Sequence, residues 1–320
     1  MIKNPEELTF ADKKFSMILY GSPGVGKTTL ALSAPDPVII DFDRGISRVK
    51  AQHRKTTIVC DSYEEVLEDI KSPIVTDCQT VIIDTGGSFV TFLQDWAMRS
   101  NPQVNKQKNG AISLKGFGAV KSEFSRFTSI LKDVMKKNVI YVFHSQEQTD
   151  KDGNPQQRLM CEGAARNAVW TPCDFGGYVQ MIGENRIVCF SPEQEFFAKG
   201  CHGISGRFTV PTLKDTDTND FVTRLFDQAK ETIELENEAF APLREKYEVL
   251  METGLEMISR ISTPEQANEA RKAIAESPNV LTSAKELQSH FKAKCADLGY
   301  VWDKELNGFK VKEGAKGAIE

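Results

Sequence analysis

Short apolar runs alternate with helical patterns over the first part of the chain. The runs predict buried strands at Phe15–Tyr20, Val38–Asp41, Thr56–Cys60, Thr80–Asp84 and Asn138–His144. Apolar residues recur at helical spacing in Tyr63–Lys71 and Ser122–Lys137, and another helix is expected from about Lys27 to Ser33. Strands that alternate with helices form right-handed crossovers. The pattern therefore predicts an α/β fold with a mainly parallel sheet covered on both faces.

The pattern changes in the second half of the chain. Gly177–Ile182 and Arg186–Phe190 predict a terminal β-hairpin around Gly183, placed at the end of the sheet. From about Phe226 the chain is charged and helix-rich. Thr263 and Ser283 each fit the capping-box spacing of a helix start, and Asn307-Gly308 signals a short terminal hairpin. We therefore expect an α/β domain over residues 1–225 and a helical extension over residues 226–320.

Composition and charge limit the partners and the cellular compartment that can be expected. The chain has 320 residues and a formal net charge of -5, so there is no overall attraction to nucleic acid or to anionic membranes. Its seven cysteines are scattered without a CxxC pair, which argues against a zinc ribbon and favours reduced thiols. The start of the chain lacks the apolar core of a signal peptide, and no stretch approaches a membrane span. These features predict a soluble, cytoplasmic protein that does not contact a membrane.

The first predicted strand runs into a complete GxxxxGK[ST] motif. Its residues are Gly21, Ser22, Pro23, Gly24, Val25, Gly26, Lys27 and Thr28, and Thr29 follows in the predicted helix. In such a P-loop the backbone N–H groups wrap the phosphates of a nucleotide, the lysine reaches the β- and γ-phosphates, and the hydroxyl ligates Mg²⁺. The motif predicts that Gly21–Thr29 binds ATP with Mg²⁺. ATP is expected over GTP because no guanine-reading NKxD motif occurs.

Polar residues at neighbouring strand ends supply the remaining chemistry. Asp84 ends a buried strand and is expected to hold Mg²⁺ together with Thr28. Asp41 and Asp43 lie on the same side of the second strand's end, and either is a candidate to activate water. His144 and Gln146 end the fifth predicted strand, where a polar side chain can either sense the γ-phosphate or only cap the following turn. Lys27, Asp43, Asp84 and Gln146 are therefore the candidate catalytic residues.

Several segments together resemble one family. The P-loop GSPGVGKTTLA is followed by PVIIDFDRG, TVIIDT, VFHSQEQTDKDG and FFAKG, over about Phe10 to Pro211. This set resembles the short RecA-like P-loop ATPases of bacteriophages, related to the RecA/RadA/KaiC branch, some of which act in recombination and single-strand annealing. The resemblance implies that Asp43 is the catalytic carboxylate, although a glutamate is commoner there. For a phage-encoded protein, the cytoplasm would be that of the host cell.

The same resemblance implies contacts within a homo-oligomer. A lysine and an arginine two residues apart, after the hairpin, often reach the ATP of the neighbouring subunit in that family. Lys199 fits the lysine, whereas Cys201 stands where the arginine would be, and Arg207 is the nearest substitute.

Two polar segments are candidates for a nucleic-acid surface. Between Asp95 and Glu123 the chain is expected to form a flexible basic loop, with Phe117 available for stacking, and the positive residues are Arg99, Lys106, Lys108, Lys115 and Lys121. A second flexible segment is expected from Gln146 to about Ala168. Single-stranded DNA is the partner that the resemblance implies. The alternative is that both segments are solvated surface loops.

Two other functions remain open from the sequence. One is a P-loop kinase for a nucleoside or small molecule, although no compact arginine lid occurs beyond Arg158 and Arg166. The other is a nucleotide-gated protein that hydrolyses ATP slowly and binds a partner through its helical extension. Stimulation of ATP hydrolysis by DNA would separate the recombination function from both.

Overall fold

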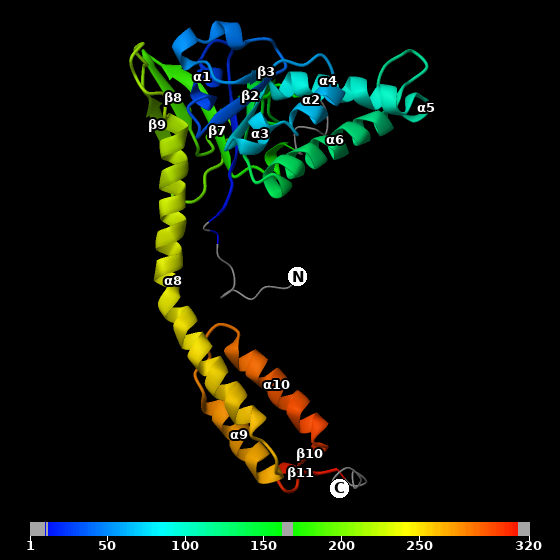
Figure 1. Ribbon diagram of the computed structural model, residues 1–320, viewed down its shortest axis with the longest axis vertical. Helices are drawn as coiled ribbons and strands as arrows, with labels where there is room; N and C mark the ends of the chain where they lie inside the picture. The colour runs from blue at the N-terminus through cyan, green and yellow to red at the C-terminus, as the bar shows by residue number, and fades with distance from the viewer. Residues whose placement is uncertain (1–9, 11, 162–168, 313–320) are drawn as a thin grey trace. The chain divides into compact units, whose positions relative to one another are not determined.

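A large sheet forms the centre of the computed structural model, which describes residues 10, 12–161 and 169–312. The sheet has nine strands in the order β3-β2-β4-β5-β1-β7-β8-β9, with β6 paired to β5 (Figure 1). Their bounds are β1 (Ser16–Gly21), β2 (Pro37–Asp41), β3 (Thr57–Ile58), β4 (Thr80–Asp84), β5 (Asn138–Thr149), β6 (Pro155–Leu159), β7 (Phe175–Ile182), β8 (Asn185–Cys189) and β9 (Arg207–Val210). The strands from β3 to β7 in this order are parallel, which confirms the predicted mainly parallel α/β sheet.

Strand register brings the motif-bearing residues to one edge. β5 lies between β1 and β4, and it pairs Gly21 with His144 on one side and Asp84 with Val142 on the other. β2 in turn pairs Asp41 with Asp84. Because parallel strands all end on the same side, the P-loop and the polar residues after β2, β4 and β5 meet at the carboxyl edge of the sheet.

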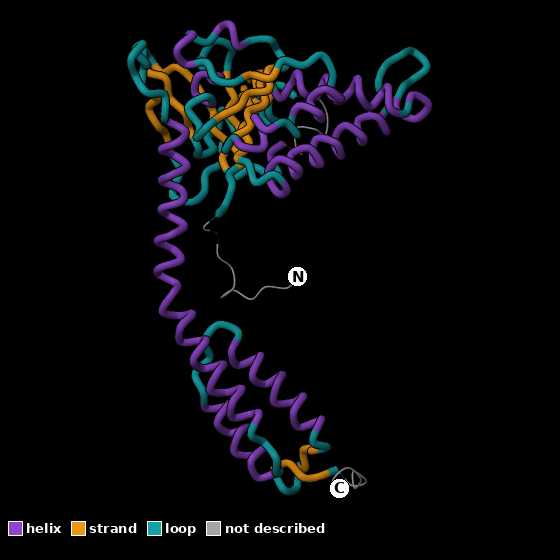
Figure 2. Tube along the Cα trace, in the orientation of Figure 1, coloured by secondary structure: helices purple, strands orange, loops and turns teal. Residues whose placement is uncertain are grey.

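Helices cover both faces of this sheet (Figure 2). They are α1 (Lys27–Ala31), α2 (Tyr63–Asp69), α3 (Pro73–Asp77), α4 (Gly86–Ser100), α5 (Pro102–Asn105) and α6 (Leu114–Ser129), with the 3-10 turns η2 (Ile46–Arg48) and η3 (Ala51–His53) and the π-helical turn η4 (Ile130–Val134). On one face Phe89 of α4 and Phe124 and Phe127 of α6 are fully buried in an aromatic core. On the other face Phe226 packs on Phe15 and Phe175.

The hairpin between β7 and β8 is confirmed, but a second hairpin was not expected. Ser145–Thr149 pairs antiparallel with Pro155–Leu159, so the prediction of a flexible segment from Gln146 is wrong over this stretch. The side chain of Asp150 accepts hydrogen bonds from the N–H groups of Asp152 and Asn154, which fixes the turn. The sequence signal was Asp152-Gly153, a common turn pair. Arg166 lies outside the described residues.

The predicted basic loop between Asp95 and Glu123 is also mostly helical. Arg99 belongs to α4, Lys115 and Lys121 belong to α6, and α5 intervenes. Ser113 caps α6 by accepting from the N–H of Gly116. A Cβ at Gly116 would lie 2.6 Å from the carbonyl oxygen of Asn105. The glycines that suggested a flexible loop include one that allows α5 to approach α6 closely.

The C-terminal residues form a separate helical unit. It contains the later part of α8 (Phe221–Ser259), then α9 (Pro264–Glu276), α10 (Ser283–Asp297) and the antiparallel pair β10 (Tyr300–Asp303) and β11 (Gly308–Val311). The capping box at Thr263 is confirmed. The one expected at Ser283 is wrong, because Thr282 is the cap residue and the Ser283 hydroxyl accepts from the N–H of Val280.

The two compact units separate between Thr232 and Ile233, inside α8. The start of α8 lies in the α/β unit because Val222, Phe226 and Ala229 are fully buried there. The expected boundary after residue 225 therefore falls within a helix. Among the described residues, no helix is both long and apolar enough to cross a membrane.

Candidate functional site

The P-loop has the left-handed backbone that its glycines permit. Gly24 and Gly26 have φ values of 81° and 84°, a region that residues with a Cβ rarely adopt. Lys27 is 5% exposed, and its Nζ donates hydrogen bonds to the carbonyl oxygens of Gly21 (3.0 Å) and Ser22 (2.8 Å). Burial lowers the pKa of Lys27 to about 8, against the opposing attraction of Asp84. The loop thus holds a buried amine beneath its own backbone.

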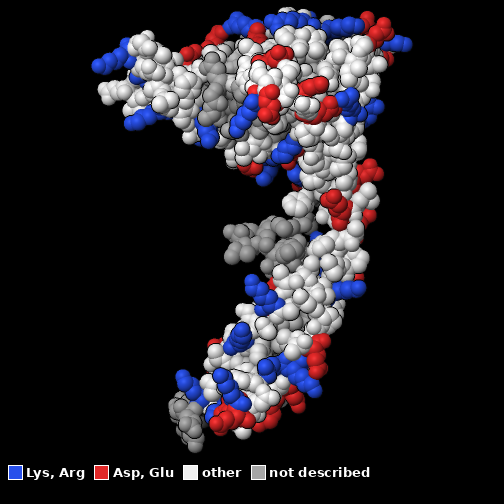
Figure 3. All heavy atoms as spheres, turned by 180° about the vertical axis from the view of Figure 1, so that it is seen from behind, with Lys and Arg blue, Asp and Glu red and all other residues white. Residues whose placement is uncertain are grey.

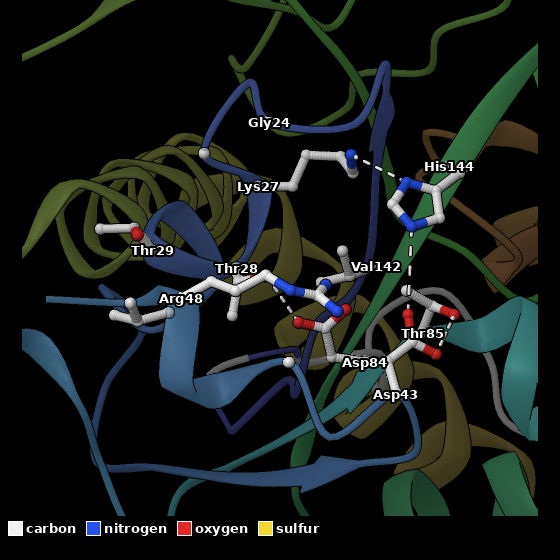
Figure 4. Close-up of a pocket in the computed structure, with 13 residues that line it drawn as sticks. Gly24, Lys27, Thr28, Thr29, Asp43, Arg48, Asp84, Thr85, Val142 and His144 are labelled. Carbon is white, nitrogen blue, oxygen red and sulfur yellow. Dashed lines mark hydrogen bonds and ion pairs between the residues drawn. The ribbon is translucent and has the colours of Figure 1, made fainter.

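Thr28 and Asp84 form the next part of the site. The Thr28 hydroxyl donates to Asp84 Oδ2 at 2.6 Å, so a hydroxyl and a carboxylate oxygen lie side by side (Figure 4). Burial, with a smaller contribution from the nearby carboxylates of Asp43 and Asp41, raises the pKa of Asp84 to about 6, although the hydrogen bond from Thr28 opposes this. Both groups face a cavity of about 160 Å³ lined by Gly24, Gly26, Lys27, Thr28, Thr29, Asp43, Gly45, Arg48, Val49, Asp84, Thr85, Val142 and His144.

The two aspartates after β2 have different surroundings. Asp41 is 1% exposed, and its carboxylate accepts from the N–H groups of Gly45 (2.9 Å) and Ile46 (2.8 Å). Asp43 lines the cavity and accepts hydrogen bonds from the hydroxyls of Thr85 and Ser88. Asp41 is therefore occupied in shaping the turn, whereas Asp43 faces the P-loop.

β5 contributes His144 to this cavity, while Gln146 lies beside it. His144 Nδ1 is 3.4 Å from Lys27 Nζ, and its Nε2 is 3.9 Å from Asp43 Oδ2 (Figure 4). Burial lowers the pKa of His144, as does the neighbouring Lys27. Gln146 lines a second cavity of about 470 Å³, which shares Asp43, Thr85 and His144 with the first. The structure thus places His144, rather than Gln146, against the P-loop lysine.

Arg48 is a cavity residue that sequence reasoning missed. It lies at the end of η2 and lines the cavity with Lys27 and Asp84 (Figure 4). Asp41 holds the turn that carries Arg48 by accepting from the N–H of Gly45. The sequence could have indicated this turn, because a buried carboxylate at a strand end is followed by a glycine. No motif marks the arginine itself.

The residues expected to act across subunits have partners within the chain. Lys199 Nζ donates to the carbonyl oxygen of Cys173 at 2.5 Å. Arg207 forms a paired interaction with Glu193, with Nε donating at 2.8 Å to one carboxylate oxygen and an Nη group contacting the other.

The fold and this geometry agree with a match to a known family. A family model described as an AAA domain matches residues 13–202, which is more than half of the chain. The chain belongs to this family. Comparison with curated proteins gives no match. An AAA domain of this type is a P-loop ATPase domain, so nucleotide binding is the general function of the domain, and the matched residues include the whole P-loop.

The raised pKa of Asp84 gives a prediction about stability. The ionised carboxylate costs stability above the folded pKa of about 6, and the cost disappears below the reference value of 3.8, where both states are protonated. Without Mg²⁺ and nucleotide, Asp84→Asn should raise the free energy of unfolding at pH 8 by up to about 3 kcal/mol and have little effect at pH 4. Chemical denaturation in EDTA at both pH values measures this. The control is Asp69→Asn, which replaces an exposed aspartate in α2 and should show no such pH dependence. If Asp84→Asn raised the free energy of unfolding equally at both pH values, the raised pKa of Asp84 would be contradicted.

Proposed function

We propose that this AAA domain is a Mg²⁺-dependent ATPase of the bacteriophage RecA-like type that works on single-stranded DNA in recombination or annealing. The observation that carries the ATPase part is the convergence of Lys27, Thr28 and Asp84 on one cavity, with Asp43 in its wall. A glycine-rich β–α turn with no ligand would not require a buried lysine or a hydroxyl held against a buried carboxylate.

The oxygens of Thr28 and Asp84 fit Mg²⁺, which prefers oxygen ligands and keeps several water and phosphate ligands. Among the described residues, no group of three or more histidine, cysteine or acidic side chains forms a metal site. When bound, Mg²⁺ would neutralise charge on the phosphates.

The protein's own residues then have distinct roles in hydrolysis. The backbone of Gly21–Thr29 binds the phosphates, and Lys27 stabilises the charge that develops on the β- and γ-phosphates. Asp43 accepts a proton from the attacking water, and the hydroxyls of Thr85 and Ser88 orient its carboxylate. His144, with its pKa lowered by burial, remains neutral near pH 7 and can accept or donate a hydrogen bond between Lys27 and Asp43. Gln146 would contact a group in the adjoining cavity.

The charge distribution supports a DNA surface on the α4–α6 projection. Figure 3 shows lysine and arginine side chains gathered at the projecting end formed by α4, α5 and α6. Among the candidates, Arg99 is paired with Glu64 at 2.8 Å, whereas Lys106, Lys108, Lys115 and Lys121 form no ion pair with the described residues. The exposed Leu114 and Val104 at the same end add apolar surface. Such a mixture suits contact with phosphates and unstacked bases.

Neutralising this end should weaken DNA binding in a salt-dependent way. Replacing Lys106, Lys108 and Lys115 with glutamine should lower affinity for single-stranded DNA and reduce the slope of log K against log salt by about 2. The control replaces the exposed Lys285, Lys292 and Lys304 of the C-terminal unit with glutamine, which makes the same change in net charge. Fluorescence anisotropy over a salt series measures both triple variants. An unchanged slope for the first variant would remove this surface from the interface.

A phosphotransferase is the second candidate, favoured by the cavity beside the P-loop. That cavity of about 470 Å³ presents Thr91, Gln94 and Gln146 next to Asp43, which suits a small polar acceptor. Arg158, one of the arginines considered for a lid, stacks on Phe197 instead, 3.3 Å from the ring centroid, and lines a different cavity. A nucleotide-gated partner-binding protein is supported only by the separate helical unit.

One experiment separates these functions. ATP labelled in its γ-phosphate is incubated with the protein and Mg²⁺, with and without single-stranded DNA, and the label is followed. We expect free phosphate, released faster with DNA. Label on a nucleoside or small-molecule acceptor would establish the kinase. Slow release that DNA does not change would favour the partner-gated protein. Gel filtration with and without ATP would then test whether the chain forms a homo-oligomer, which any role of Lys199 and Arg207 between subunits requires.

A further inference from the structure

Another cavity continues from the P-loop on the side of Thr29. It has a volume of about 250 Å³, just below the range of roughly 300–1,000 Å³ that is usual for ligand pockets. Thr29 lines both this cavity and the phosphate cavity, whereas Lys27, Asp84 and His144 line only the latter. The two cavities therefore meet at Thr29, just after the P-loop motif.

The outer wall of this cavity is the segment of residues 211–220, which is fixed against α1. Asn219 Nδ2 donates to the carbonyl oxygen of Thr29 at 2.8 Å. The start of α8 is also attached, because the N–H of Val222 donates to Ser33 Oγ at 2.9 Å and the N–H of Thr223 donates to the Ser33 carbonyl at 3.0 Å. Segments far apart in the sequence are thus joined by specific hydrogen bonds around the cavity.

The chemistry of the lining is that of a site for a flat, partly polar group. Leu30, Leu213 and Phe221 supply apolar surface, while Asp217, Thr218 and Asn219 supply polar groups on the outer segment. Aliphatic and aromatic surfaces hold a base by its faces, and carboxylate or amide oxygens accept from its amino group or from ribose hydroxyls.

Arg186 of β8 connects this cavity with the P-loop. A Cβ at Gly26 would lie 2.8 Å from Arg186 Cζ, so the guanidinium rests directly on the loop backbone. Arg186 Nε is buried and has no hydrogen-bond partner among the described residues. A buried donor without a partner is costly, and an arginine beside a phosphate-binding loop has an obvious acceptor in a phosphate oxygen.

We infer that this cavity holds the nucleoside of the nucleotide, with Arg186 contacting the phosphate next to the ribose. This rests on the proposed function, because the P-loop orients the phosphates. The γ-phosphate lies toward Lys27 and Asp84, so the α-phosphate and the nucleoside leave the loop at Thr29. At that point the structure offers this cavity. The hairpin strand β8 and the segment of residues 211–220, which lies beyond the matched AAA domain, thereby become part of nucleotide recognition.

The test uses two ligands that differ only in the nucleoside end. Calorimetry measures the binding of Mg²⁺·ADP and of Mg²⁺·pyrophosphate to the full chain. Thr218→Trp, which places an indole in the cavity, should lower the affinity for ADP about tenfold or more and leave that for pyrophosphate unchanged. The control is Thr216→Trp, the same exposed residue type on the same segment but outside the lining, which should bind both ligands normally.

A second measurement does not depend on a substitution. Photolabelling with an azido-adenine analogue of ADP, followed by peptide mapping, should place the label within residues 210–224, and excess ADP should suppress it. Equal affinities of Thr218→Trp and wild type for ADP, or a label elsewhere, would overturn the nucleoside site while pyrophosphate binding still supported the P-loop. If wild type bound neither ADP nor pyrophosphate, the proposed function itself would fail.

Discussion

Lys27→Ala is expected to lower the affinity for Mg²⁺·ATP about 100-fold and to abolish turnover. The buried amine is the cation that faces the β- and γ-phosphates, and hydrogen bonds to charged groups contribute roughly 1.5–3 kcal/mol each. Two such bonds to phosphate oxygens account for a loss of this size, because each tenfold change corresponds to about 1.4 kcal/mol. Calorimetric titration with a non-hydrolysable ATP analogue measures the affinity directly.

The chain offers a closely matched control for this variant. Lys137 is 6% exposed, and its Nζ donates to the carbonyl oxygens of Thr76 and Cys78, but it does not line the P-loop cavity. Lys137→Ala therefore removes a buried lysine that also holds two backbone carbonyls. We expect it to lower the melting temperature while ATP affinity stays at the wild-type value. Equal ATP affinities for Lys27→Ala and Lys137→Ala would contradict the role of Lys27.

Asp43→Asn should lower the rate of ATP hydrolysis by roughly 10²–10⁴, which is the usual contribution of a general base. Nucleotide affinity should be nearly unchanged, because Thr28, Asp84 and the P-loop backbone remain in place. Asparagine keeps an oxygen that can accept from Thr85 and Ser88 but cannot take a proton from water. Single-turnover measurements separate this loss in the chemical step from any change in binding.

The Asp41→Asn variant tests the other candidate for the catalytic carboxylate, because the pattern of residues alone did not decide between Asp41 and Asp43. The Asp41 carboxylate accepts from two backbone N–H groups, so an amide can satisfy only one of them, and we expect a loss of about 1–3 kcal/mol in unfolding free energy. Asp43→Asn should leave the melting temperature within a few degrees of wild type. Full turnover by Asp43→Asn would move the activation of water to Asp41 as a base or to Gln146 as a group that orients the water, and the rates of their own variants would then identify which.

The local parts of the site could be predicted from the sequence because they are continuous in the chain. The P-loop from Gly21 to Thr29 and the buried strand that ends in Asp84 each carry their own signal, and the structure places both at the expected edge. Asp43 could be preferred to Asp41 only through a resemblance. The geometry separates the two residues by showing which carboxylate is already bound to backbone.

The remaining features depend on contacts between distant segments. Arg48 and Arg186 reach the P-loop from a 3-10 turn and from an antiparallel strand, and no spacing rule connects them with Lys27. The helix α6 was predicted to begin too late, because glycines at positions 116 and 118 suggested a flexible loop. Gly116 is instead required where α5 packs on α6. Composition could not distinguish a glycine needed for close packing from one needed for flexibility.

The structure also locates the basic residues of the proposed DNA surface in more detail than the sequence could. The basic residues near Lys106 were expected in one loop, but they are distributed over α4, α6 and the segment between them that contains α5. Helical scaffolding holds these charges at fixed positions relative to one another. If the proposed surface binds DNA, the salt dependence of binding measures how many of these charges take part.

The most direct test of the central claim is phosphate release from Mg²⁺·ATP by the full chain, compared with Lys27→Ala, in the absence and presence of single-stranded DNA. We predict steady release by the wild-type protein, a clear increase with DNA, and no release by Lys27→Ala under either condition. Wild-type release that does not exceed the Lys27→Ala value, with or without DNA, would contradict the assignment of the protein as an ATPase.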